Sequence, residues 1–174
     1  MTDFKVKGKV WLITDINGEL INDIDTDQIF HNAFLHITEI SEMGEHTFGN
    51  LEGWENFPEK CNPGDIVFAG SNFGAGSSRQ QAVDCFEALG IKAIVAESYG
   101  AIYKRNAVNS GFPILIFKQI NNFVKDGAIK NLDEIEIDFL AGELKNASSG
   151  KIFKIDPFSK VQKDIMEKGS LLTI

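Results

Sequence analysis

Cysteine is scarce in this sequence: its 174 residues include two, Cys61 and Cys85. Two cysteines are too few for the disulfide-dense scaffold of a small secreted protein. They are also too few to hold an iron–sulfur cluster, which usually needs four thiolates. We therefore expect no cofactor held by this chain itself, and we expect a cytoplasmic protein whose thiols stay reduced.

Long apolar runs are absent as well. No stretch approaches the roughly 20 apolar residues that a membrane-spanning helix needs. The first residues, MTDFKVKGKVWLIT, lack the charged, then apolar, then small-residue plan of a signal peptide. The sequence therefore predicts no membrane association.

The chain has no excess of positive charge. Its 17 Lys and Arg residues are outnumbered by 25 Asp and Glu residues, so the net charge is −8. Affinity for nucleic acids depends mostly on basic side chains that neutralise phosphates, so this charge argues against a nucleic-acid partner. It does not exclude a small anionic substrate, because one arginine beside a helix N-terminus is enough to bind a carboxylate.

The apolar segments that are present alternate with helical patterns. We expect strands at residues 5–14, 66–69, 91–98 and 112–117, and helices at residues 77–90 and 99–111. This order of strand, glycine-rich loop, helix, strand, helix and strand predicts an α/β fold with a largely parallel sheet covered by helices.

The flanks of this α/β centre are different. We expect a loop at 15–30, a short helix around 33–42, a hairpin-like pair at 135–139 and 152–155, and a final helix from Pro157 to Gly169. There is no internal repeat and no long linker. We therefore predict one compact β/β/α domain over residues 1–174, with a mixed sheet and flanking helices.

The glycine-rich loop has the composition of an anion site. In AGSNFGAGSSRQQ, residues 69–81, the glycines allow a tight turn and a close approach to a ligand. We expect Ser77 and Ser78 at the cap and first turn of the next helix, where unpaired N–H groups and the positive end of the dipole lie. Arg79 adds a planar fork suited to a carboxylate.

Simpler interpretations of the same residues stay open at this point. A serine before a helix is often just an N-cap, and an arginine in a first turn is often solvated. Two nucleotide-binding motifs can be set aside. No lysine follows the last glycine as in a P-loop, and Gly70, Gly74 and Gly76 lie at the wrong offsets for a dinucleotide fingerprint.

A longer pattern resembles a known family. GSNFGAGSSRQQA, followed by ALGIKAIVAESYGAIYKRNAVNSGFPIL, is similar to the swivel domain of the aconitase superfamily, in particular to the small subunits of 3-isopropylmalate dehydratase and homoaconitase. DIDTDQI at residues 23–29, GDIVFAG before the glycine loop and GSLL at residues 169–172 fit the same family pattern.

The resemblance implies a specific activity. Members of this family dehydrate and rehydrate hydroxy di- and tricarboxylic acids together with a large subunit, whose [4Fe–4S] cluster acts as a Lewis acid. By position in the family motif, Ser77 is the base, Ser78 a second hydroxyl donor and Arg79 the clamp for a substrate carboxylate. The first expectation is the small subunit of 3-isopropylmalate dehydratase in leucine biosynthesis. Homoaconitase, dimethylmalate dehydratase and a non-catalytic RNA-binding or regulatory module are the alternatives, and self-association without the large subunit is left open.

Some positions depart from the family pattern. Gln80 stands where glutamate is common, and the segment FLHI, residues 34–37, places His36 where an arginine often binds substrate. A histidine has only partial charge near neutral pH, which suits a substrate whose variable group needs no full positive charge. A shifted register or a plain surface histidine is the alternative. We expect His31 and His46 at the surface, and turn and cap roles for the acidic residues of DIDTDQI.

Overall fold

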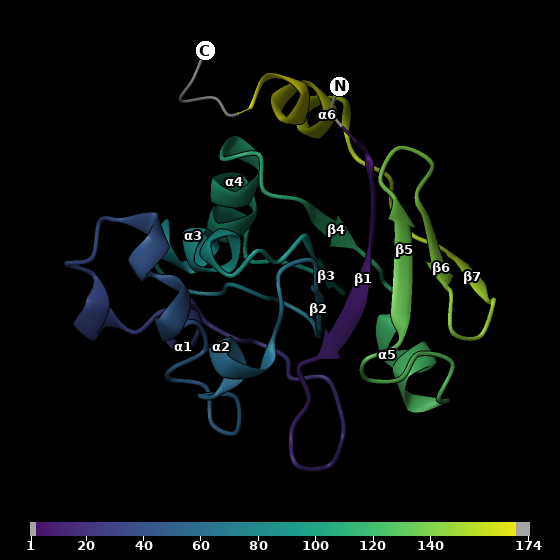
Figure 1. Ribbon diagram of the computed structural model, residues 1–174, viewed down its shortest axis with the longest axis horizontal. Coiled ribbons are helices and arrows are strands. Elements are labelled where there is room, and N and C mark those ends of the chain that lie inside the picture. Colours follow the sequence, from purple (N-terminus) through teal and green to yellow (C-terminus); the bar gives the residue numbers. More distant parts are fainter. Residues whose placement is uncertain (1–2, 170–174) are drawn as a thin grey trace.

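The computed structural model describes residues 3–169, so most of the GSLL motif lies outside the described residues. A seven-stranded sheet runs through this part of the chain in the order β4-β3-β2-β1-β5-β6-β7 (Figure 1). Its strands are β1 (Lys5–Leu12), β2 (Ile66–Ala69), β3 (Ala93–Ala96), β4 (Ile114–Ile116), β5 (Glu134–Asp138), β6 (Glu143–Asn146) and β7 (Ile152–Lys154).

The helices are short. They are α1 (Thr26–Ile29), α2 (Phe57–Lys60), α3 (Gln81–Ala88), α4 (Ala101–Asn109), α5 (Ile120–Lys125) and α6 (Lys160–Lys168), together with the 3₁₀ turns η1 (Asn32–Phe34), η2 (Ile40–Glu42) and η3 (Gly44–His46). Within residues 3–169, no helix has the length and apolar character to cross a lipid bilayer.

Strand β1 joins two different halves of the sheet. Its end, Val10 to Leu12, pairs in parallel with β2, and β3 and β4 continue the parallel half. Its beginning, Lys5 to Lys9, pairs antiparallel with β5, and β6 and β7 continue the antiparallel half. The predicted α/β class, with a mixed sheet and flanking helices, is confirmed.

The parallel strands are buried on both faces. In β2, Val67 and Ala69 enter the core that includes residues of α3 and α4, while Ile66 and Phe68 enter a second core on the opposite face. This double burial explains why the strand reads as an unbroken apolar run, IVFA, rather than as an alternating pattern.

The predicted helix around 33–42 was wrong. The structure has 3₁₀ turns there, and between the ends of η1 and η2 no residue is fully buried. Without a buried apolar stripe, tertiary packing does not stabilise a continuous α-helix.

The C-terminal part contains three strands, β5, β6 and β7, instead of the predicted pair. The sequence analysis did not predict β6. One of the two residues that β6 buries is polar, so its pattern resembles a polar connection. Asn146 is fully buried and donates from Nδ2 to Asp133 Oδ2 over 2.7 Å and to the carbonyl of Ala128 over 3.1 Å. The final helix is confirmed as α6, with Gly169 as its C-cap.

Candidate functional site

The glycine loop lies at the carboxyl end of β2, where it is held between two other segments. The N–H of Gly74 donates to Ile24 over 2.7 Å, and the N–H of Phe73 donates to Ser98 over 3.0 Å. The bond between Thr26 N–H and the carbonyl of Ala75 extends the first of these contacts. Loops that follow neighbouring parallel strands meet at one edge of a sheet, which is where α/β proteins commonly bind ligands.

Gly74, within this loop, has no room for a larger residue. Its φ is +78°, and a Cβ atom at this position would overlap the Tyr103 ring of α4. Tyr103 in turn donates from its hydroxyl to the carbonyl of Ala82 in α3, over 2.9 Å. The loop backbone therefore packs directly on α4, and α4 is hydrogen-bonded through Tyr103 to α3, the helix that follows the loop.

The prediction that Ser77 and Ser78 lie at the cap and first turn of α3 was wrong. The helix begins at Gln81, its N-cap is Gln80, and no side chain caps it. The backbone at Ser77 is turned toward α1 instead, because its carbonyl accepts from Thr26 Oγ1 over 3.0 Å. Ser77 and Ser78 are both exposed.

Arg79 is anchored rather than solvated. Its side chain is 11% exposed, and Nη1 donates to Asp27 Oδ1 over 2.9 Å and to the carbonyl of Phe30 over 2.8 Å. The structure shows no hydrogen bond from its Nε or Nη2 to any residue in 3–169. One side of the guanidinium is thus fixed to Asp27 and the Phe30 carbonyl, and the donors on the other side have no hydrogen-bond partner within residues 3–169.

Ser77, Ser78, Arg79 and the residues that contact them form the cluster around Arg79. Asp27 belongs to this cluster, but the sequence analysis did not assign it to the site. The hydrogen bond from Arg79 lowers the pKa of Asp27 below its ordinary value of 3.8, with help from the Asn32 N–H and against the effect of burial. Its neighbour Asp25 does have the predicted cap role, since its carboxylate accepts from the Gln28 N–H at the start of α1.

Asn106 of α4 is the second residue that the motif did not reveal. Its Nδ2 donates to Ser78 Oγ over 3.1 Å. The loop is therefore contacted by α1 through Asp27 and by α4 through Asn106. In the sequence these residues are 79 positions apart, so spacing gave no sign that they meet.

His36 lies in an exposed turn after η1. Its ring forms no hydrogen bond with Ser77, Ser78 or Arg79. The turn does reach the start of α3, where Gln81 Nε2 donates to the carbonyl of Leu35 over 3.3 Å. His46 is only partly at the surface: its side chain is 21% exposed and its ring stacks on Phe34 with centroids 3.8 Å apart.

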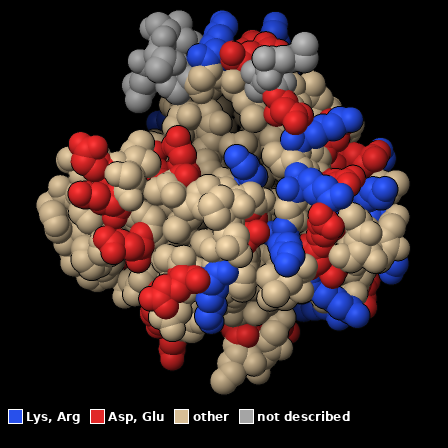
Figure 2. Space-filling view, viewed as in Figure 1, with Lys and Arg blue, Asp and Glu red and all other residues tan. Residues whose placement is uncertain are grey.

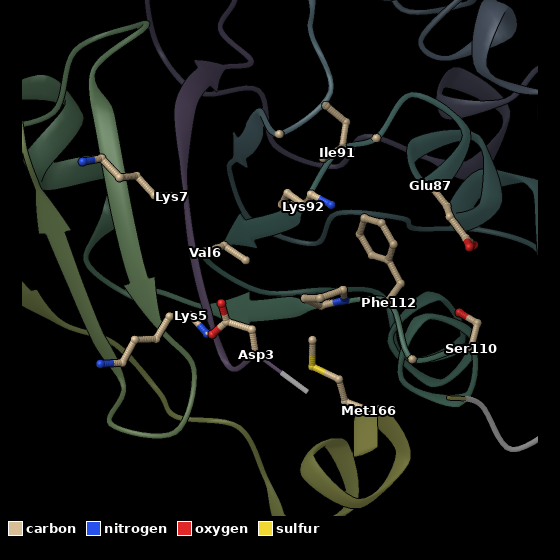
Figure 3. Close-up of a pocket in the computed structure, with 14 residues that line it drawn as sticks. Asp3, Lys5, Val6, Lys7, Glu87, Ile91, Lys92, Ser110, Phe112 and Met166 are labelled. Atoms are coloured by element: carbon tan, nitrogen blue, oxygen red, sulfur yellow. The ribbon is translucent and has the colours of Figure 1, made fainter. Parts of the chain in front are cut away.

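The cavity drawn in Figure 3 lies at the other edge of the sheet. It measures about 540 Å³, and its lining includes Gly64, Lys92 and Pro113, which precede β2, β3 and β4. The glycine loop follows β2, and four strand residues span about 13 Å. This cavity is therefore not part of the cluster around Arg79.

The residues of this chain do not fit an iron–sulfur cluster. Within residues 3–169, no three His, Cys, Asp or Glu side chains are grouped as a metal site. Cys85 is fully buried, and burial raises its pKa to about 12; burial likewise raises the pKa of Cys61 to about 11. Both thiols are thus held in the protonated form, which does not bind metal.

Comparisons with known proteins identify relatives of this chain. The model of the aconitase C-terminal domain matches residues 55–119. A 3-isopropylmalate dehydratase small subunit from Thermodesulfovibrio yellowstonii is 36% identical over 168 residues, which cover 97% of this chain and 92% of the relative. A methanogen homoaconitase small subunit from Methanothermobacter thermautotrophicus is 34% identical, over 96% of this chain and 88% of the relative.

The fold has a solved counterpart as well. The crystal structure of 3-isopropylmalate dehydratase from Methanocaldococcus jannaschii superposes with a TM-score of 0.82 at 32% sequence identity, and the match covers 97% of this chain and 92% of that one.

Proposed function

Because the chain belongs to the 3-isopropylmalate dehydratase small-subunit family of the aconitase superfamily, we propose that it is the small chain of a two-subunit hydro-lyase. The first candidate reaction is the isomerisation of 2-isopropylmalate to 3-isopropylmalate. The observation that supports it most directly is Arg79, held at the mouth of the glycine loop by Asp27 and the Phe30 carbonyl.

In this proposal Arg79 binds a carboxylate of the substrate. Asp27 and Phe30 occupy Nη1, so Nε and Nη2 can form the two parallel hydrogen bonds that a carboxylate accepts. Removal of a proton next to that carboxylate increases its negative charge. A fixed guanidinium stabilises this charge more than a mobile one, because it needs no reorientation during the reaction.

Ser77 acts as the base and Ser78 as a hydrogen-bond donor in the same proposal. A serine hydroxyl is a weak base unless nearby positive charge stabilises its alkoxide. Arg79, two residues further on, is such a charge. The Asn106 amide donates to Ser78 Oγ, which leaves the Ser78 hydroxyl proton available for the substrate.

The large subunit holds the [4Fe–4S] cluster in this proposal, and activity requires both chains. Both exposed serines lack a cover from this chain, and a site for proton abstraction works best when water is excluded. The proposal includes a single swivel domain over residues 1–174 and a cytoplasmic location, in keeping with two free cysteines.

His36 is proposed to help distinguish substrates, because Gln81 connects its turn to the start of α3.

Homoaconitase is the second candidate function, since a homoaconitase small subunit is 34% identical to this chain. The net charge of −8 opposes an RNA-binding role.

The test is co-expression with the cognate large subunit, anaerobic cluster reconstitution, and a panel of isopropylmalate, homocitrate, citrate and dimethylmalate. In the assembled complex we expect Ser77→Ala to lower kcat by 10² to 10⁴, roughly the contribution of a positioned base, while the substrate still binds. Ser71→Ala, in the same loop, is the matched control. Near-normal turnover by Ser77→Ala would refute the assignment of the base.

A further inference from the structure

A braced turn at residues 15–19 holds one isoleucine out in solvent. The Asp15 carboxylate accepts from the N–H groups of Asn17 and Glu19, over 2.8 and 3.1 Å, and the N–H of Gly18 donates to the Asp15 carbonyl over 3.0 Å. Ile16, at the tip, is 100% exposed. A turn with these internal bonds keeps the apolar side chain outward instead of letting it fold back onto the protein.

A groove lies beside this turn. It measures about 620 Å³, and its apolar lining includes Ile16, Leu51 and Trp54. The Trp54 indole donates from Nε1 to the carbonyl of Thr14 over 2.9 Å, so it ties the far wall of the groove to the base of the turn. The exposed Ile16 side chain and the concave wall beside it together offer an apolar surface to another protein.

Two residues that line the groove belong to segments that contact the glycine loop or hold Arg79. Gln28, which lines the groove, is next to Asp27 in α1, and Ile21, which also lines it, accepts from the N–H of Gly70 at the start of the glycine loop over 3.1 Å. A protein that covers Ser77 and Ser78 and extends over α1 therefore reaches the groove.

We propose that the turn at 15–19, together with the groove lined by Leu51 and Trp54, is a docking surface for the large subunit, with Ile16 as the apolar anchor. The inference rests on the proposed function, which supplies the partner. The turn projects at the end of the molecule opposite α6, and uncharged residues make up most of the projection (Figures 1 and 2). Asp15 and Glu52 are exposed around the anchor, while Glu19 is paired with Lys125 over 3.8 Å, so the matching surface is an apolar recess with basic side chains opposite Asp15 and Glu52.

The experiment measures the affinity of the small subunit for the cognate large subunit by titration calorimetry. Ile16→Asp is expected to weaken binding by tenfold to a hundredfold, the usual effect of losing a buried aliphatic anchor. The melting temperature of the isolated variant should not change, because Ile16 is fully exposed there. Ile16→Leu should retain affinity. Val161→Asp, in the exposed first turn of α6, is the matched control and should bind like the wild type.

Other outcomes decide against the surface. An Ile16→Asp variant whose affinity for the large subunit is within twofold of the wild-type affinity overturns the proposal. So does an Ile16→Asp variant that breaks a self-associated form of this chain but keeps its affinity for the large subunit, since the groove would then bind a second copy. A wild-type complex that forms but turns over none of the four acids counts against the proposed function alone, because the affinities can still be compared.

Discussion

At the scale of single residues, the arrangement of Arg79 is the most informative feature. Free arginine side chains sample many rotamers, and fixing one side of the guanidinium removes much of that freedom before a ligand arrives. Asp27 does this with one carboxylate oxygen at 2.9 Å. It is therefore a positioning residue in the proposed site, and it leaves two nitrogens of Arg79 for the substrate.

The ion pair between Asp27 and Arg79 predicts an acid-dependent contribution to stability. The pKa of Asp27 is lowered in the folded protein, so the pair stabilises the fold above the ordinary pKa of 3.8, and the contribution is lost as pH falls through the lower folded value. The melting temperature of wild type minus that of Asp27→Asn should be positive at pH 6 and should shrink below about pH 4.

The size of this effect is modest because Asp27 is 41% exposed. Circular dichroism melts at four or five pH values give the measurement. Glu42→Gln, at an exposed carboxylate for which the described residues provide no ion pair, serves as the control variant in the same measurements. A difference for Asp27→Asn that stays constant from pH 6 to pH 3 would contradict the assignment of the pair.

At the scale of elements, the glycine loop is a rigid connection between β2 and α3. Its backbone is bonded to the segment at 24–26 and to Ser98, and its aromatic residue Phe73 is buried in the core with an edge contact to Tyr103, at 5.3 Å between centroids. The exposed Ser77 and Ser78 thus follow a fixed base, which favours a preformed site over one that orders on binding.

Gly74→Ala should destabilise the protein by roughly 3 kcal/mol, from about 1–2 kcal/mol for a positive φ and a further 1–3 kcal/mol for overpacking against Tyr103. Gly127→Ala is the matched control, since its φ is +79° but nothing lies within 4 Å of the added Cβ. Urea unfolding of both variants separates the two effects. Equal losses in the two variants would show that the Tyr103 contact is easily relieved.

At the scale of the whole molecule, the candidate site belongs to the parallel half of the sheet and not to the antiparallel half. The parallel strands place their following loops at one edge, whereas β5, β6 and β7 form a meander that packs on the second core. Strand β1 takes part in both halves, so one continuous strand joins the parallel half of the sheet to the antiparallel half.

The two cysteines report on the integrity of this packing. At pH 7.5 the native protein should react very slowly with iodoacetamide, because burial raises the pKa to about 11 for Cys61 and about 12 for Cys85. In denaturing urea both should react at the rate of a free thiol. Mass spectrometry gives the stoichiometry, and rapid alkylation of the fully buried Cys85 in the native protein would show that the core opens near it.

Local patterns determined much of the fold. The run IVFA predicted β2, and the apolar stripe through Ala82, Val83 and Phe86 predicted the body of α3. The start of α3 was misplaced by four residues, because helix propensity does not reveal that Thr26 turns the Ser77 backbone away. The 3₁₀ turns η1 and η2 replaced the helix predicted around 33–42 for a different reason, since neither turn buries a residue and tertiary packing therefore does not stabilise an α-helix there.

By itself, the sequence determined the composition of the site: flexible glycines, two hydroxyls and one guanidinium in a single loop between a strand and a helix. These residues are adjacent in the chain, so their proximity needs no fold. Only the tertiary structure decided that Asp27 holds Arg79 and that Asn106 reaches Ser78. The physical reason is that side chains from α1 and α4 meet the loop only after parallel strands bring three separate connections to one edge of the sheet.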